Sequence, residues 1–192
     1  MSHPWPSEPG IALLVPVATV DEAASAAAAG AGAGLVDAGD DAALVPAIRR
    51  AVSGVRVCGE HEDADLMRDA DLAARTGAAL ICPGADAAEA AARRGVAAGR
   101  ILVQAAPAGI EAVVRAGWPV LADLEGLADL EGGADLGGAA GLARAEAAAA
   151  ICAWLGASVL RTRHVAKVRR CADMTESILG RRPPAWAVRG LA

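Results

Sequence analysis

The sequence contains no phenylalanine and no tyrosine, and tryptophan occurs at only four positions. Hydrophobic residues nevertheless make up 55% of the 192 residues, so a core has to be built from alanine, valine, leucine and isoleucine. Small side chains of this kind allow helices to pack closely on strands but provide few large anchors. The length is sufficient for one domain with a sizeable core.

Other absences narrow the class of protein. The net charge of −5 gives no basic excess, which excludes a general nucleic-acid surface. No stretch of about 20 residues is free of glycine, proline and charge, so we expect no membrane span. Residues 1–10 lack a basic segment followed by an apolar run, so no signal peptide is expected. The four cysteines are far apart and form no C-x-x-C motif, which predicts reduced thiols in a cytoplasmic protein.

Short apolar runs alternate with alanine-rich helical patterns along most of the chain. This alternation is typical of a parallel α/β fold. Seven runs are predicted to be strands: residues 11–15, 35–37, 55–58, 79–82, 101–104, 119–122 and 158–161.

The last of these runs is followed at once by a cationic cluster. Ser158-Val159-Leu160 is long enough for one buried strand, and Arg161, Arg163, His164 and Lys167 come directly after it. In parallel α/β folds the chemistry gathers at the carboxyl ends of strands. The cluster is therefore the best candidate for a binding site.

The segment around this cluster resembles the closing strand of the dihydropteroate synthases, a family of pterin-binding (β/α)8 barrels. Residues 156–165 read G-A-S-V-L-R-T-R-H-V, similar to the family's G-A, two apolar residues and R-V-H-D-V. Arg161 falls on the family's arginine, Arg163 where the family has histidine, and His164 where it has aspartate. The phrase G-A-G-L-V-D-A-G at 32–39 is similar to the family's second strand, and places Asp37 on its aspartate.

Other segments are similar to the family's sequence around the strands but lack its functional residues. Gly117–Leu121 is similar to the G-Y-P-V-L that precedes the strand with the family's essential lysine, but Asp123-Leu124-Glu125-Gly126 stands where Ser-Arg-Lys is expected. Gln104 occupies the position of the family's catalytic-site aspartate, and the family's Asp and Asn on strands three and four correspond to Cys58 or to no residue of this chain. The family's Ser-Thr-Arg-Pro loop is missing after Asp37.

The resemblance implies a TIM-like barrel of parallel strands with seven to eight β/α units, incomplete relative to the family. One unit is expected to be lost near residues 54–78, where residues 63–76 read as a single helix and strand three or strand four is missing. The gap would expose a strand edge that dimerisation could cover. The expected organisation is an extended lead-in at 1–10, one barrel domain at 11–180, and a loosely packed tail at 181–192.

The resemblance implies three alternative functions. The first is a protein that binds a small anionic or heterocyclic ligand and has lost most of the usual catalytic residues. The second is an active synthase-type transferase of folate biosynthesis with a rebuilt site, and the third is a non-catalytic partner of a complete synthase. The predicted ligand-binding residues are Arg161, Arg163, His164, Asp37, Gln104, Asp123 and Cys58.

Structural roles compete with some of these assignments. Arg161 could bridge to Asp37 or Asp123 and only close the barrel, and Asp37 could be a helix cap or turn residue. The run Glu60-His61-Glu62-Asp63 has metal-binding side chains, but contiguous ligands without a second histidine favour a solvated loop. The glycine- and acid-rich stretch 123–138 is either a mobile lid or a solvated connector, and its spacing is not that of a calcium loop. We expect no metal and no cofactor.

Overall fold

The computed structural model describes residues 10–29, 34–125 and 139–182. The predicted lead-in before Gly10, the stretch 126–138 of the predicted lid or connector, and the tail from residue 183 lie outside these residues. None of the helices in the described part of the chain is both long and apolar enough to span a bilayer.

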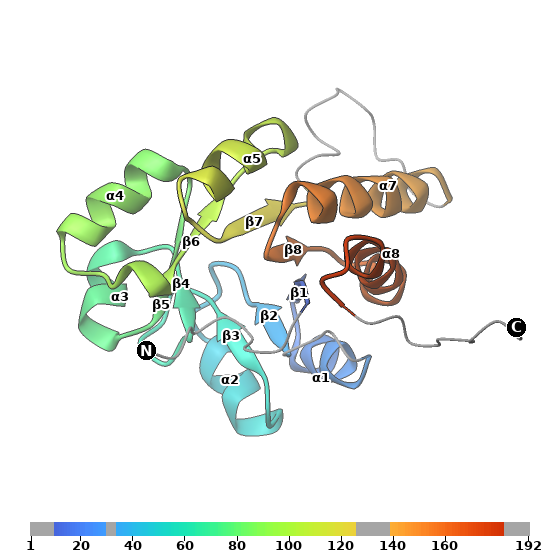
Figure 1. The fold of residues 1–192 in the computed structure, drawn as a ribbon. Helices are drawn as coiled ribbons and strands as arrows, with labels where there is room; N and C mark the ends of the chain where they lie inside the picture. The colour runs from blue at the N-terminus through green and yellow to red at the C-terminus, as the bar shows by residue number, and fades with distance from the viewer. Residues whose placement is uncertain (1–9, 30–33, 126–138, 183–192) are drawn as a thin grey trace, which may run out of the picture.

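Eight parallel strands close into a barrel in the order in which they occur along the chain, so that β1 pairs with both β2 and β8. Helices surround the strands on the outside (Figure 1). The strands are β1 (Ala12–Pro16), β2 (Leu35–Asp37), β3 (Arg56–Cys58), β4 (Leu66–Met67), β5 (Ala79–Cys82), β6 (Ile101–Gln104), β7 (Val120–Asp123) and β8 (Val159–Arg161). The helices of the described residues are α1 (Val20–Ala28), α2 (Leu44–Ala51), α3 (Ala70–Thr76), α4 (Ala85–Arg93), α5 (Pro107–Arg115), α7 (Ala139–Leu155) and α8 (Val165–Ile178), with a 3-10 turn at Ala98–Arg100.

The predicted parallel barrel is confirmed, and each of the seven predicted strands lies within one residue of its observed position. The expected loss of strand three or four is wrong, because β3 and β4 are both present and leave no open edge. The single helix expected at 63–76 is also wrong. Its first part contains β4, and α3 begins only at Ala70, where the Asp69 carboxylate accepts the backbone N–H groups of Asp71 and Leu72.

A helix is missing between β3 and β4, and a short loop replaces it. Residues 59–65 form turns, although parallel strands usually need a longer crossover. The path can be short because β3 has three residues and β4 only two. The Arg49 guanidinium on α2 holds the loop by donating to the Asp63 carbonyl at 2.8 and 3.0 Å. Between β3 and β4, residues 59–65 thus keep both strands in the barrel without a helix to connect them.

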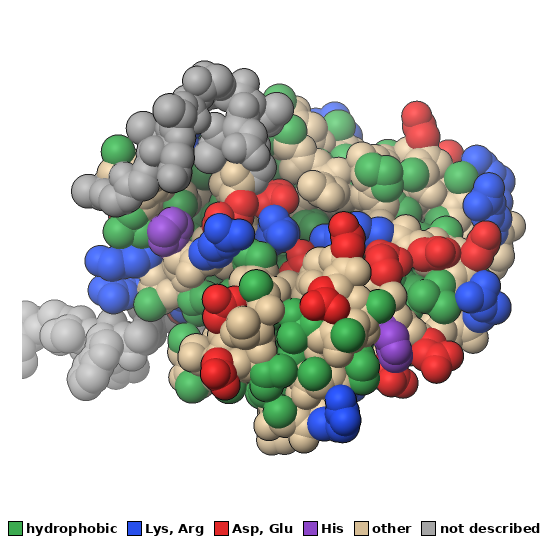
Figure 2. Space-filling model, turned by 180° about the vertical axis from the view of Figure 1, so that it is seen from behind, with side chains coloured by type: hydrophobic (Ala, Val, Ile, Leu, Met, Phe, Trp, Pro, Cys, Tyr) green, Lys and Arg blue, Asp and Glu red, His purple; other side chains and the backbone are tan. Residues whose placement is uncertain are grey.

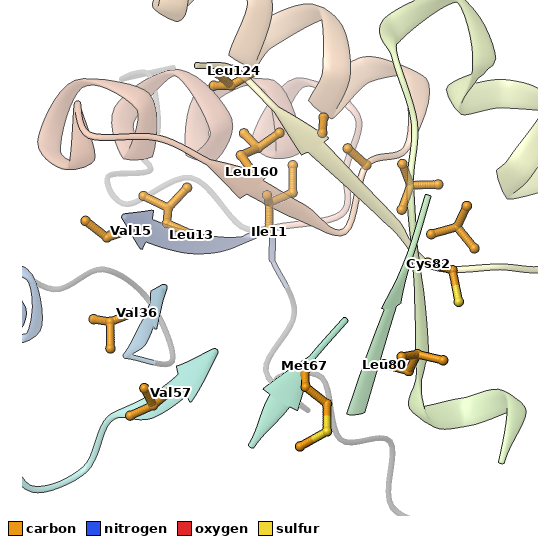
Figure 3. Close-up of a cluster of buried hydrophobic side chains, with 14 of the residues drawn as sticks. Ile11, Leu13, Val15, Val36, Val57, Met67, Leu80, Cys82, Leu124 and Leu160 are labelled. Carbon is orange, nitrogen blue, oxygen red and sulfur yellow. The ribbon is translucent and has the colours of Figure 1, made fainter. Parts of the chain in front are cut away.

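Aliphatic side chains fill two layers, as the lack of phenylalanine and tyrosine predicts. The outer layer lies between strands and helices and includes Leu13, Val36, Leu80 and Leu160 (Figure 3). The inner layer fills the barrel itself, and consists of Ala12, Leu14, Leu35, Cys58, Leu66, Ala79, Ile81, Leu102, Leu121 and Val159. Side chains that point into the barrel recur at every second position of a strand. A polar residue two positions beyond an inner-layer residue therefore also points toward the barrel axis, at one end of the barrel.

Candidate functional site

Polar side chains cap the inner layer at the carboxyl ends of the strands. Each lies two residues beyond an inner-layer residue, so the alternation along the strand turns it toward the barrel axis. The residues so placed are Asp37 after Leu35, Arg68 after Leu66, Gln104 after Leu102, Asp123 after Leu121 and Arg161 after Val159.

Asp37 is the centre of an ion-pair network at this mouth of the barrel. Its side chain is 0% exposed, and its Oδ2 accepts from Arg161 Nε at 2.8 Å and from Arg68 Nη2 at 3.1 Å. Its Oδ1 accepts the backbone N–H of Gly39 at 3.1 Å. Both carboxylate oxygens are therefore occupied by groups of the protein itself.

Arg161 joins three strands of the barrel. From β8 it reaches Asp37 on β2, and its Nη1 lies 3.2 Å from Oδ2 of Asp123 on β7. The alternative that Arg161 bridges to Asp37 or Asp123 is confirmed, and it bridges to both. Asp37, Arg68, Asp123 and Arg161, called the mouth cluster below, carry two positive and two negative charges and so have no net charge.

Arg68 is the member of the mouth cluster that the sequence prediction missed. Besides Asp37, its guanidinium contacts the Cys58 sulfur at 3.8 Å, and its backbone N–H donates to Glu60 Oε1 at 2.8 Å. Its segment Leu66-Met67-Arg68 repeats the pattern of Leu35-Val36-Asp37, two apolar residues and then a charge. That signal was present, but assignment of the segment to a helix hid it.

The environment fixes the protonation states at the mouth. Burial acts to raise the pKa of Asp37, but the Arg68 charge and the hydrogen bonds from both arginines outweigh it and hold that pKa below its ordinary value. Burial, reinforced by the nearby Asp37 carboxylate, raises the pKa of Cys58 far above its usual range. Cys58 is therefore a neutral thiol beneath the cluster and not a nucleophile.

A hollow of about 890 Å³, called the outer hollow below, opens beside the mouth cluster between β1, α1 and the start of α8. One wall carries the basic residues Arg161, Arg163, His164 and Lys167, with the Asp37 carboxylate beside Arg161. The opposite wall is largely apolar, with Val17, Ala26 and Ala29 among its residues, and it carries one carboxylate among the lining residues, that of Glu22. The first turn of α8 contains no acidic residue, so its free backbone N–H groups add to the positive potential of this wall.

The predicted site residues fall into four groups. Asp37, Asp123 and Arg161 meet in the mouth cluster, while Arg163 and His164 line the outer hollow with Arg161. Cys58 lies buried below the cluster. Gln104 is exposed at the end of β6, and among the described residues no hydrogen bond joins its side chain to the cluster.

The loop with the Glu60-His61-Glu62-Asp63 run is folded by local hydrogen bonds. His61 Nδ1 accepts the backbone N–H of Asp63 at 3.1 Å, and Glu60 accepts from Arg68. Within residues 10–29, 34–125 and 139–182, no three histidine, cysteine, aspartate or glutamate side chains are grouped so that they could hold a metal ion.

Comparison with known proteins links this geometry to one family. No family model matches the chain. The chain is 34% identical over 83 residues to "Inactive dihydropteroate synthase 2" of Mycobacterium leprae, and 38% identical over 80 residues to the protein of the same name from Mycobacterium tuberculosis. These matches cover 43% and 42% of this chain but 28% and 25% of the relatives, so the chain spans only about a quarter of the curated proteins it matches.

Solved structures match over nearly the whole chain. Mycobacterium tuberculosis Rv1207 superposes with a TM-score of 0.71 at 24% identity, covering 93% of this chain and 95% of that one. A dihydropteroate synthase from Coxiella burnetii in complex with pteroic acid gives a TM-score of 0.72 at 14% identity, covering 90% and 93%. At these identities the structural matches establish the fold, and the sequence matches add a similarity to the inactive synthases over less than half of the chain. The chain is a divergent dihydropteroate synthase-like protein, built on the parallel barrel that these structures share.

Proposed function

We propose that this protein binds a small anionic or heterocyclic ligand in the outer hollow and does not carry out the synthase reaction. The observation that carries the proposal is the self-neutralised mouth cluster. Asp37 accepts from two arginines and a backbone N–H, so it has little capacity left for a ligand inside the barrel. The relatives named inactive dihydropteroate synthase 2 support the same conclusion.

The residue inventory also argues against the synthase reaction. The chain has a single lysine, Lys167, which lies on α8 and not on the strand where the family resemblance expects one. It has no asparagine at all, and Gln104 replaces an expected aspartate with a neutral amide. These losses support binding without turnover.

The outer hollow suits a ligand with an anionic group and an apolar body. Guanidinium and ammonium groups contact phosphate oxygens through charge-assisted hydrogen bonds. Arg163 and Lys167 are both exposed. Arg163 lies 3.9 Å from a carboxylate oxygen of Glu125 across an exposed contact, and Lys167 has no ion-pair partner among the described residues. The apolar wall from α1 would then cover the body of the ligand.

Binding can be tested by a thermal-shift screen with pyrophosphate, pterins, p-aminobenzoate and folates, followed by calorimetry on any ligand that raises the melting temperature. We expect Arg163→Gln and Lys167→Gln each to weaken a phosphate-bearing ligand by about 5- to 10-fold through loss of one charge-assisted contact. Arg115→Gln, an exposed arginine on α5, is the matched control and should bind as the parent does.

The same samples distinguish the alternatives. Incubation with a pterin pyrophosphate and p-aminobenzoate should release no pyrophosphate. Release above the level of a protein-free sample would support the active transferase instead. Affinities unchanged in both the Arg163 and Lys167 variants would remove the outer hollow as the ligand site.

Exposed apolar side chains favour a second candidate, a partner role based on self-association or pairing with a complete synthase. The adjacent helices α7 and α8 expose Ile151 at 55%, Trp154 at 57%, Met174 at 61% and Ile178 at 66%. We expect Trp154→Glu together with Met174→Glu to shift any dimer toward monomer in analytical ultracentrifugation. A parent protein that is monomeric at all concentrations, and that does not bind a complete synthase, would rule out this role.

Composition and surface support a proposal for the location and for one class of partner. Four free cysteines support a reducing, cytoplasmic environment. Figure 2 shows acidic and basic side chains next to one another across the middle of one face, which supports the expectation that nucleic acid is not a partner.

A further inference from the structure

The wall that α1 contributes to the outer hollow is long and mostly aliphatic. Four lining residues come from α1 and its C-cap: Glu22, Ser25, Ala26 and Ala29. Their spacing of i, i+3, i+4 and i+7 places them on one face of the helix. Seven residues of helix rise by about 10 Å, the length of an extended alkyl chain of about eight carbons. Beyond Glu22 in the first turn, this face presents one hydroxyl group and two methyl groups to the hollow.

Aliphatic side chains from three other parts of the barrel complete the apolar lining. Val17 follows β1, Val165 is the first residue of α8, and Leu142 lies on α7. None of the described residues that line the hollow is aromatic. The segments 30–33 and 126–138, which lie outside the described residues, contain no aromatic residue in their sequence. The described lining therefore offers an aliphatic surface without an aromatic ring on which a flat heterocycle could stack.

The carboxylates of the hollow are already engaged by the protein. Both oxygens of Asp37 accept hydrogen bonds within the mouth cluster and its loop, and Glu22 Oε2 accepts the backbone N–H of Ala18 at 2.7 Å. A heterocycle such as a pterin carries several N–H and C=O groups at its edge, and each one that loses water without gaining a partner costs affinity. An aliphatic body has no such groups, so it suits this lining better.

The basic wall supplies sites for an anionic head group. The Arg163 side chain is 73% exposed and lies 3.9 Å from Glu125, so it remains accessible from the hollow. Lys167 is also exposed and lies one helical turn into α8. The hollow of about 890 Å³ thus has basic groups on one side and an aliphatic surface on the other, and it is large enough for a ligand that contacts both.

We propose that the outer hollow binds a single-chain amphiphile, a phosphate or carboxylate head group on an unbranched aliphatic chain of about six to ten carbons. The head group contacts Arg163 and Lys167, and the chain lies along the face of α1 that ends at Ala29. This inference rests on the function proposed above and narrows its ligand from anionic or heterocyclic to anionic and aliphatic.

Calorimetry with butyl, hexyl and octyl phosphate, each below its critical micelle concentration, tests the chain. We expect the affinity to rise about 2- to 4-fold for each added methylene group, so that octyl phosphate binds at least about 10-fold more tightly than butyl phosphate. Octyl glucoside, which has no charge, should bind at least about 10-fold more weakly than octyl phosphate. Octanoate, at equal chain length, distinguishes a carboxylate head group from a phosphate, and length-dependent binding of either series supports the proposal.

Variants of the aliphatic wall separate the chain from the head group. Ala29→Gln and Leu142→Gln place a neutral polar side chain along the hollow and should each weaken octyl phosphate by about 5-fold, while the affinity for inorganic pyrophosphate changes by less than about 2-fold. Ala28→Gln is the matched control, because Ala28 is an exposed alanine of α1 that does not line the hollow. It should bind every ligand as the parent does.

The outcomes distinguish this inference from the function on which it rests. Suppose pyrophosphate binding depends on Arg163 and Lys167, but affinity does not rise with chain length or a pterin pyrophosphate binds more tightly than octyl phosphate. The aliphatic ligand is then wrong and the binding function stands. Equal loss of octyl phosphate in Ala28→Gln and Ala29→Gln would also overturn the proposed path of the chain. If none of these ligands binds at millimolar concentration, the proposed function fails and this inference fails with it.

Discussion

Replacing Asp37 by asparagine is expected to lower the free energy of unfolding by about 2 to 3 kcal/mol, near the lower end of the range for breaking a buried ion pair. The change keeps the shape of the side chain but removes the charge that compensates Arg68 and Arg161. The loss stays near the lower end because these two side chains remain 37% and 23% exposed, so water screens part of the lost attraction. Urea denaturation at pH 7 measures the effect.

A matched control is available three residues along the chain. Asp40 is exposed, and Asp40→Asn should change the free energy of unfolding by less than about 0.5 kcal/mol. Equal, small effects of the two substitutions would show that water already compensates the arginines, and that the mouth cluster contributes little to stability.

The pH dependence of the Asp37 effect has a defined sign. The pKa of Asp37 lies below its ordinary value of 3.8 in the folded protein, because the two arginines outweigh the opposing effect of burial. Its stabilisation is therefore complete above about pH 5 and is lost as the pH falls through the lower, folded-state pKa. The difference in unfolding free energy between the parent and Asp37→Asn should be constant from pH 5 to 7 and shrink below pH 4.

The strands could be predicted because each one except β4 is an apolar run that local sequence reveals. β4 could not, since two residues, Leu66 and Met67, are too few for an alternation to show. The acidic residues before it and the alanines after it read as one helix. Asp69 marks the start of α3, but the sequence around it contains several other aspartates, so Asp69 could not be recognised from the sequence as the helix cap.

Part of the site could also be predicted, since Asp37, Asp123 and Arg161 each follow a predicted strand directly. Their contacts could not, because the hydrogen bond between Arg161 and Asp37 joins residues 124 positions apart. That bond depends on the closure of β8 onto β1 and of β1 onto β2, which no local pattern encodes. Because β4 was not predicted, Arg68 could not be recognised as a residue at the end of a strand.

Arg68→Ala is expected to lower stability by about 1 to 2 kcal/mol and to create a binding site for a guanidinium ion beside Asp37. The substitution removes one donor from Asp37 Oδ2 and leaves a space of the shape of the lost group, while Asp37 stays paired with Arg161. Methylguanidinium at about five times its Kd should restore about 1 kcal/mol by mass action. Millimolar concentrations are far below those that denature proteins, so the parent should not be stabilised.

Arg75→Ala, at an exposed arginine on α3, is the control and should show neither the loss nor the rescue. Arg68→Lys should lose part of the stability without gaining the rescue, because the ammonium group still fills the space. If methylguanidinium shifts the melting of the parent, Arg75→Ala and Arg68→Ala equally, Arg68 does not occupy an inner site. A selective rescue would mean that the barrel has a carboxylate-based inner site whose occupant is its own side chain, which would agree with the proposal that a ligand binds in the outer hollow and not inside the barrel.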